Sequence, residues 1–221
     1  GEGSYAVTAY NYEGENVTVS ERPYFKGEQT FSVKKGIATN VDLTCKLALV
    51  MINLLPTLLL VPVPFAPVQI ILMELFMDLM AAASFVTEKP EADLLKQKPR
   101  DPRAKFMDEG MTRSIVISSL GLFIAVTVVY LLTWYNTKDT ATSQTVAFFG
   151  WLIGHVMLAF NMRSERQPMF QLGLTSNRIM LIWTAAVGMF LISISTIPGA
   201  QTLMKTTTLT SSQWAIILGA T

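Results

Sequence analysis

The chain has 221 residues and a formal net charge of +1; 51% of its residues are hydrophobic and 15% are charged. So small a net charge excludes a nucleic-acid binder held by bulk positive charge, and the charged fraction is well below the roughly 25% of a soluble domain. The single cysteine excludes an intramolecular disulfide and a cysteine-based metal cluster. This composition predicts a membrane protein.

Residues 1–45 differ from the rest, because glycines separate short alternating runs rich in Val, Thr, Tyr and Phe. The runs SYAVTAYNY, NVTVSE, TFSVKKG and TNVDLTC predict β-strands joined by turns. Such a set is too small for a core of its own, so we expect a β-rich segment that is part of a β-sandwich. We expect no signal peptide, because the chain does not open on a basic and then apolar stretch.

Apolar blocks of about 20 residues, enough to cross roughly 30 Å of hydrocarbon, fill most of residues 46–221. The predicted spans are Lys46–Val63, Val68–Val86, Arg113–Tyr135, Gln144–Met162, Arg178–Ile197 and the shorter Gln213–Thr221. The expected fold class is therefore mostly α: a polytopic membrane helix bundle of five full spans plus a truncated sixth, with a small β-rich N-terminal segment. The two expected domains are residues 1–45 and residues 46–221.

Basic residues concentrate in the loops 87–109 and 163–178, whereas the opposite loops hold only Lys138 and Lys205. The positive-inside rule places the two basic loops in the cytoplasm. The start of the first span is then cytoplasmic too, which conflicts with a secreted type of β-module. We expect a multi-pass protein of a bacterial inner membrane.

Glu74 and Asp78 interrupt an apolar span at a spacing of four residues. On a helix they share one face, and an acid at the bilayer centre is costly unless it is paired or faces a wet cavity. They predict half of a cation or proton site, with His155, Lys46 and Asn53 as candidate partners. A purely structural polar pair inside a helix bundle is the alternative.

Each candidate partner also has a second interpretation. His155 is as compatible with a buried structural histidine as with a ligand. Lys46 lies near a helix end, where its ammonium group can snorkel to the interface. Asn53 and Pro56 together indicate a kink capped by an amide. Cys45 has no expected partner and no expected role.

Two stretches carry a family resemblance: VPFAPVQIILMELFMDLMAAASF followed by EKPEADLLKQKPRDPR, and WLIGHVMLAFNMRSERQPMFQLGLTSNRIMLIW. From about Leu43 onward the chain resembles the C-terminal membrane domain of P-type cation-transporting ATPases, the class that includes calcium pumps. The resemblance places the family's Asn-x-x-Thr-Asp ligand motif on Glu74, Met77 and Asp78. It also places an acidic ligand of a later helix on His155.

In the preceding helix, the resemblance puts Lys46 and Leu49 where the family has Asn and Glu ligands. The remaining donors suit calcium poorly, because calcium takes six to eight oxygens. Carboxylates near a histidine and a lysine suit a proton or a monovalent ion better. The charged loop 87–109 is either a solvated connector or, as the resemblance implies, a surface on which a phosphorylation domain rests.

The phosphorylation, dephosphorylation and hinge motifs of this family, DKTGT, TGES and GDGxNDxP, do not occur in the 221 residues. The resemblance thus implies an ATPase fragment in which Mg²⁺ and ATP act only through absent domains. We expect no cofactor in this chain and no ATPase activity from it alone. The expected partners are the lipid bilayer, a cation or proton, and the missing cytoplasmic ATPase domains, with no nucleic acid.

The first 45 residues carry a second resemblance. Tyr5–Tyr10, Pro23–Gly27, Thr30–Gly36 and Thr39–Ala48 are similar to the β-sandwich modules of secreted Bacteroidetes lipoproteins. Two alternatives to a transport fragment follow: a membrane-anchored β-sandwich surface or adhesion module, and a chimera of two unrelated pieces. A junction would lie at TCKLA, where the two resemblances meet.

Overall fold

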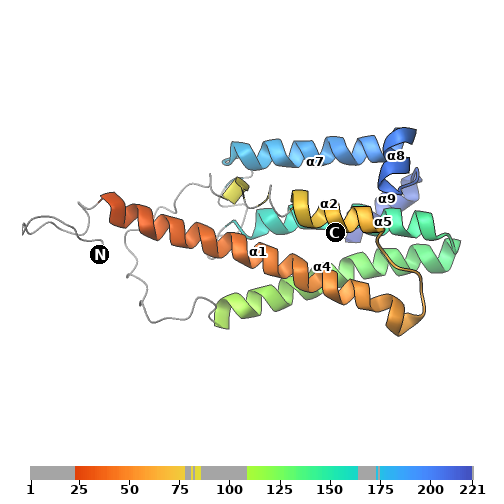
Figure 1. Ribbon diagram of the computed structural model, residues 1–221, viewed down its shortest axis with the longest axis horizontal. Coiled ribbons are helices and arrows are strands. Elements are labelled where there is room, and N and C mark those ends of the chain that lie inside the picture. Colours follow the sequence, from red (N-terminus) through yellow and green to blue (C-terminus); the bar gives the residue numbers. More distant parts are fainter. Residues whose placement is uncertain are drawn as a thin grey trace, which may run out of the picture.

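The computed structural model describes residues 23–77, 81, 83–85, 109–163, 173 and 175–220. The helices among them are α1 (Pro23–Leu59), α2 (Pro67–Leu72), η2 (Met73–Met77), α4 (Glu109–Thr137), α5 (Thr140–Asn161), α7 (Arg178–Thr196), α8 (Pro198–Met204) and α9 (Ser211–Ala220). Their arrangement is a bundle in which α1 crosses α4 and α7 runs along the opposite side (Figure 1). No strand occurs in these described ranges, so the predicted mostly helical fold is confirmed.

The strands predicted between Pro23 and Cys45 are wrong, because these residues belong to α1 and the helix continues to Leu59. A preference of Val, Thr and aromatic residues for strands depends on neighbouring strands and is easily overridden. The segment is instead continuous with the apolar helical residues that follow it, so its backbone hydrogen bonds are made within one helix. The predicted strands before Pro23 lie outside the described residues.

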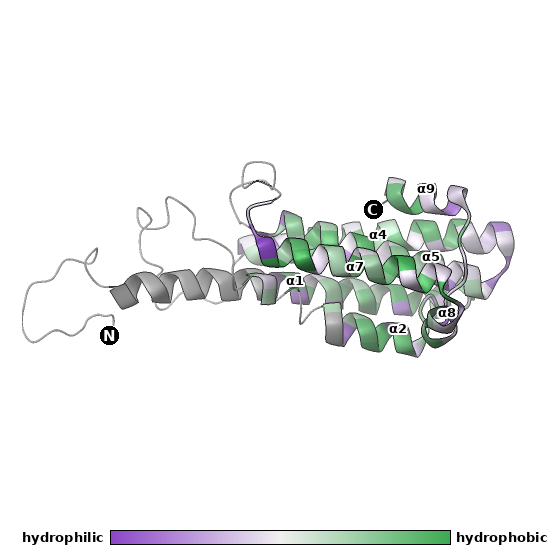
Figure 2. Cartoon of the chain, turned by 90° about the horizontal axis from the view of Figure 1, so that it is seen from above, coloured by the Kyte–Doolittle hydropathy of each residue, from purple (hydrophilic) through white to green (hydrophobic). Residues whose placement is uncertain are grey.

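Three of the described helices, α4, α5 and α7, are long and apolar enough to cross a membrane. They coincide with the predicted spans Arg113–Tyr135, Gln144–Met162 and Arg178–Ile197. Hydrophobic residues run along most of the length of these helices in Figure 2. In α5, 78% of the most apolar window is buried, against 39% in α4 and 33% in α7, so α5 is the central helix of the three.

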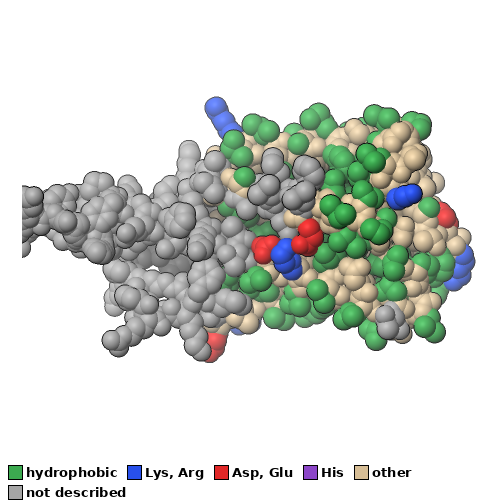
Figure 3. Space-filling view, in the orientation of Figure 1, with side chains coloured by type: hydrophobic (Ala, Val, Ile, Leu, Met, Phe, Trp, Pro, Cys, Tyr) green, Lys and Arg blue, Asp and Glu red, His purple; other side chains and the backbone are tan. Residues whose placement is uncertain are grey.

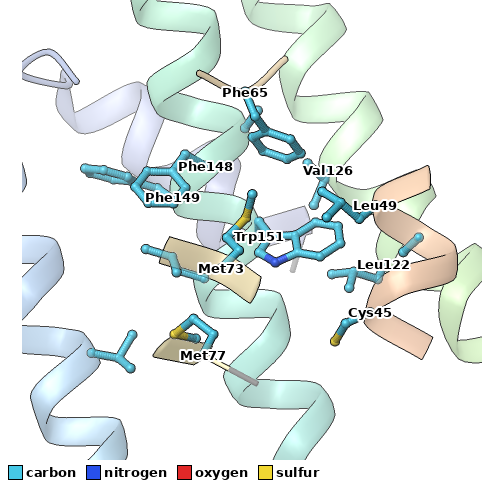
Figure 4. Packing of buried hydrophobic residues seen from close by; sticks show 14 of the residues in the cluster. Cys45, Leu49, Phe65, Met73, Met77, Leu122, Val126, Phe148, Phe149 and Trp151 are labelled. Atoms are coloured by element: carbon cyan, nitrogen blue, oxygen red, sulfur yellow. The ribbon is translucent and has the colours of Figure 1, made fainter. Parts of the chain in front are cut away.

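Trp151 on α5 lies in the middle of the hydrophobic core. Its indole is surrounded by Met73 of η2 and by Leu122 and Val126 of α4 (Figure 4). The ring of Phe65, in the connection between α1 and α2, meets the indole edge-on at 5.7 Å between centroids. Burial of these large side chains holds the α1–α2 hairpin against α4 and α5.

Two side chains from neighbouring helices hydrogen-bond to the connection between α1 and α2. The hydroxyl of Tyr130 on α4 donates to the carbonyl of Pro62, and Nε2 of Gln144 on α5 donates to the carbonyl of Val63 at 2.9 Å. The connection has no regular structure of its own, so these bonds satisfy carbonyls that lack a helical partner.

Gln69 fixes the beginning of α2. The side chain is fully buried; its Oε1 accepts from the N–H of Ala66 at 2.9 Å. Its Nε2 donates to the carbonyl of Met204, also at 2.9 Å, where α8 ends. One amide therefore satisfies a donor at the N-terminus of α2 and an acceptor at the C-terminus of α8, which joins two distant parts of the chain.

At the other end of the bundle, Asn177 and Arg163 make a corresponding connection. Oδ1 of Asn177 caps α7 by accepting from the N–H of Met180 at 3.0 Å, and its Nδ2 donates to the carbonyl of Ser84 at 3.0 Å. Arg163, 2% exposed, donates from Nη1 to the carbonyl of Gly173 at 3.0 Å. The segment that follows η2 is thus bonded to the start of α7.

Candidate cation site

One face of α1 carries Asp42, Cys45, Lys46 and Leu49, at the spacing of successive helical turns. Nζ of Lys46 lies 2.7 Å from Oε2 of Glu74 and 3.2 Å from Oδ1 of Asp42. The Lys46 side chain is 43% exposed and the two carboxylate side chains are each 41% exposed. Figure 3 shows acidic and basic side chains lying together within a mostly hydrophobic surface.

Glu74 lies in a π-helical turn, Met73–Met77, directly after the short helix α2. Pro67 begins α2 at a position where its missing N–H costs nothing. Met73 and Met77, four residues apart, are buried in the core, whereas Glu74 is directed to Lys46 on α1. π-Helical turns are rare and often occur at functional sites, so this turn marks the place at which the hairpin presents its carboxylate.

His155 is fully buried on α5, one turn after Trp151. Its Nδ1 lies 3.4 Å from Sγ of Cys45 on α1. The ring of Trp183 on α7 approaches the imidazole edge-on at 6.0 Å between centroids. Helices α1, α5 and α7 therefore all contribute to the surroundings of this histidine.

The structure brings one pair of predicted site residues into contact and places His155 beside the same turn of α1. Lys46 pairs with Glu74, and its neighbour Cys45 contacts His155. Asn53 lies two turns further along α1, about 10 Å away, and its Nδ2 donates to the carbonyl of Leu49 at 2.8 Å. Asp78, the second predicted acid, lies outside the described residues.

Asp42 was missed by the sequence analysis, and Cys45 was given no role. Asp42 precedes Lys46 by four residues, which on a helix signals an ion pair. That signal was hidden because the segment was predicted to be a strand. Nothing in the sequence indicates the contact of Cys45 with His155, since the two residues are 110 positions apart.

The charges at the first pair limit which ion can bind there. One ammonium group lies between two carboxylate groups, so its formal charge offsets one of theirs. In the described part of the chain, no three Cys, His, Asp or Glu side chains are grouped closely enough to hold a metal ion. The described residues here provide fewer side-chain oxygens than the six to eight of a calcium site.

Comparison with known families gives two matches that divide the chain. The family model described as cation transporting ATPase, C-terminus, matches residues 62–221. A model described as a domain of unknown function (DUF4493) matches residues 1–55. The second description names no function, so the similarity of residues 1–45 to lipoprotein β-sandwich modules gains no support from it.

Similar curated proteins include calcium-transporting ATPases. One from Bacillus subtilis is 23% identical over 179 residues, which cover 77% of this chain and 19% of that protein. The human type 2C member 1 is 24% identical over 196 residues, 85% of this chain and 21% of its own length. A putative plasma membrane-type pump from Arabidopsis thaliana is 29% identical over 146 residues, 63% of this chain and 14% of its own. The chain thus spans about a fifth of the length of the first two.

Proposed function

This chain belongs to the family of cation-transporting ATPase C-terminal domains, and on that premise we propose that it is the ion-binding membrane domain of a P-type cation transporter. The observation that carries the proposal is the ion pair of Lys46 with Glu74 at 2.7 Å. It lies where the family resemblance puts ligands of the transported ion. Charged side chains at such positions are costly in a membrane and mark ion pathways.

We propose that the ion is a proton or a monovalent cation, although the similar proteins are calcium-transporting ATPases. Lys46 puts a fixed positive charge beside Glu74, where a divalent ion would be repelled. The family's acidic ligand of a later helix is replaced by His155, a neutral or cationic side chain. Both changes reduce the negative charge and the number of oxygens.

In the membrane, five full spans and the beginning of a sixth account for the helices. The second half of α1 forms the first span, because it exposes Leu47, Val50, Leu54 and Leu58, which suit contact with lipid tails. The second is the predicted span Val68–Val86, to which most of α2 and all of η2 belong. Helices α4, α5 and α7 form the next three, and α9, of 10 residues, forms a shorter sixth. The basic loops then face the cytoplasm, and a bacterial inner membrane fits this orientation.

Without phosphorylation motifs, the chain would not hydrolyse ATP alone and would depend on cytoplasmic ATPase domains. The alternatives are a surface or adhesion module defined by the segment matched over residues 1–55, and a chimera. Two observations favour transport. Helix α1 runs uninterrupted through TCKLA, where a junction was predicted. The similarity to the human protein covers 85% of this chain, which is more than residues 62–221 contain, so it extends back before residue 62.

A cation-binding measurement on the purified full chain in lipid nanodiscs tests the proposal. Titrations with radioactive calcium, sodium and potassium, and proton release in weak buffer, are compared between wild type and Glu74→Gln. We expect no tight calcium binding, and a monovalent-ion or proton signal that Glu74→Gln removes. Glu109→Gln changes an exposed acid at the start of α4 and serves as the matched control.

Tight calcium binding that disappears in Glu74→Gln would refute the assignment of the ion while leaving the site in place. Equal signals from wild type, Glu74→Gln and Glu109→Gln would refute the site itself.

A further inference from the structure

An open pocket of about 530 Å³ lies between the beginning of α5 and helix α8, within the roughly 300–1,000 Å³ of small-molecule sites. Helix α5 begins and α7 ends at this end of the bundle, where α8 follows α7 at an angle (Figure 1). The basic loop 163–178 joins the other ends of α5 and α7, so the pocket lies on the opposite side. The polar side chains that line it are Thr140, Gln144, Gln201, Thr202, Lys205 and Thr206.

Lys205 gives this pocket a positive charge. The residue is exposed and ends α8 in the left-handed conformation, with φ of 55°. Its carbonyl accepts from Nε2 of the buried Gln69 at 3.4 Å, which holds the backbone in place. Within the described part of the chain its ammonium group makes no ion pair. The charge is thus available to an anionic ligand.

The neighbouring charges at this end of the bundle are already engaged. Nζ of Lys138 lies over the ring of Tyr135, 4.5 Å from its centroid. The carboxylate of Asp139 caps α5 by accepting from the N–H groups of Ala141 and Thr142. Neither charged residue lines the pocket.

Two amide side chains offer hydrogen-bond acceptors in the same pocket. Nε2 of Gln144 donates to the carbonyl of Val63 at 2.9 Å. Nε2 of Gln201 donates to the carbonyl of Ser195 at 2.9 Å and to the hydroxyl of Thr208 at 3.0 Å. These bonds engage the amide nitrogens, so the side-chain carbonyl oxygens are what the two glutamines offer to hydroxyl groups of a ligand.

Apolar side chains adjoin the pocket. Ile197 and Leu203 are 52% and 65% exposed, and they are next in sequence to Pro198 and Thr202, which line it. In a membrane such exposed side chains contact acyl chains. A polar, positively charged pocket beside an apolar surface fits an anionic amphiphile.

We propose that this pocket between α5 and α8 binds the headgroup of an anionic phospholipid that carries hydroxyl groups, of the phosphatidylglycerol class. The phosphodiester lies at the ammonium group of Lys205, the headgroup hydroxyls donate to Gln144 and Gln201, and the acyl chains lie against Ile197 and Leu203. A zwitterionic headgroup would bring a second positive charge to Lys205. The site requires the membrane placement proposed above but not the proposed transport ion.

Native mass spectrometry of the full chain in detergent micelles, titrated with phosphatidylglycerol or with phosphatidylcholine, tests the proposal. We expect the first phosphatidylglycerol to bind about fivefold more tightly than phosphatidylcholine, the contribution of one lysine near a membrane surface. Lys205→Gln should abolish this preference. Lys138→Gln is the matched control, because Lys138 lies at the same end of the bundle and also has φ of 55°; it should keep the preference.

Thr202→Phe gives a second test, because it fills the pocket and leaves Lys205 in place. We expect it to weaken the first phosphatidylglycerol at least fivefold, with unchanged far-ultraviolet circular dichroism. Equal preference in wild type and Lys205→Gln, an equal loss in Lys138→Gln, or unchanged binding in Thr202→Phe would overturn the proposal. Displacement of the lipid by equimolar inorganic phosphate would also overturn it, because the ligand would then be a soluble anion. None of these measurements depends on cation binding at Glu74.

Discussion

Replacing Gln69 by Ala is expected to destabilise the α1–α2 hairpin. The fully buried side chain accepts from the N–H of Ala66 and donates to the carbonyl of Met204. Truncation removes both bonds and leaves both backbone groups without that partner. The bond to Ala66 is buried and the bond to Met204 is part-buried.

A lost buried hydrogen bond that leaves its partner unsatisfied costs about 1–3 kcal/mol. Two such losses predict that Gln69→Ala lowers the free energy of unfolding by about 2–4 kcal/mol, because the two groups relax in part. The assay is equilibrium unfolding of the chain in mixed detergent micelles, titrated with sodium dodecyl sulfate and followed by far-ultraviolet circular dichroism.

Gln144→Ala is the matched control. Gln144 is also a glutamine, and it donates to the carbonyl of Val63 in the connection between α1 and α2 at 2.9 Å. This bond is exposed. Water replaces it, so the expected loss is about 0.5–1 kcal/mol. If both variants lose the same stability, burial of Gln69 does not determine its contribution and the reasoning fails.

Three further predictions concern helix caps and the ion pair. Hydrogen bonds from the hydroxyl and N–H of Thr142 hold the pKa of Asp139 below its ordinary value. The ionised carboxylate of Asp139 therefore stabilises α5 fully above about pH 4, and this stabilisation is lost as the pH falls through the lowered pKa. Melting temperature against pH should show this acid limb in wild type and not in Asp139→Asn, which caps without a charge. Asn177→Ala should lower the free energy of unfolding by about 1–2 kcal/mol and speed amide exchange in the first turn of α7. Asn177→Asp should restore the cap of α7 but not the bond to Ser84. Equal exchange rates in wild type and both variants would contradict the capping role of Asn177. A double-mutant cycle of Lys46→Met and Glu74→Gln should give a coupling free energy of about 0.2–1 kcal/mol for this half-exposed pair, and additive effects would show that the two do not interact.

The sequence predicts three of the apolar spans, those of α4, α5 and α7, because the signal of a span is its length. A block of about 20 apolar residues has few alternatives in any fold, and α4, α5 and α7 lie where such blocks were found. The pairing of Glu74 with Lys46 could be anticipated for a similar reason. An acid and a base in apolar surroundings have strong reasons to meet.

Pro23–Cys45 show where sequence patterns are insufficient. Alternating Val, Thr and aromatic residues are compatible with a strand or with a helix, and only the rest of the structure decides. In this chain the segment is continuous with the apolar helix that follows it. The same error concealed Asp42, whose spacing from Lys46 is informative only on a helix.

Contacts between residues distant in sequence are the second limit. Gln69 meets Met204 across 135 positions, and Cys45 meets His155 across 110. Each depends on the register in which two helices pack. A polar residue in an apolar span signals that some partner exists, but its identity is determined by packing.

The length of α1 has a mechanical consequence. Its 37 residues extend about 55 Å at 1.5 Å per residue, whereas the hydrocarbon of a bilayer accounts for about 30 Å. Its first turns project beyond the other helices in Figure 1. As a stiff rod held near one end, α1 amplifies small rotations: a tilt of about 10° displaces the tip of a projecting length of about 25 Å by about 4 Å. Conversely, a force applied at that tip acts on the turn that carries Lys46 through a long lever arm.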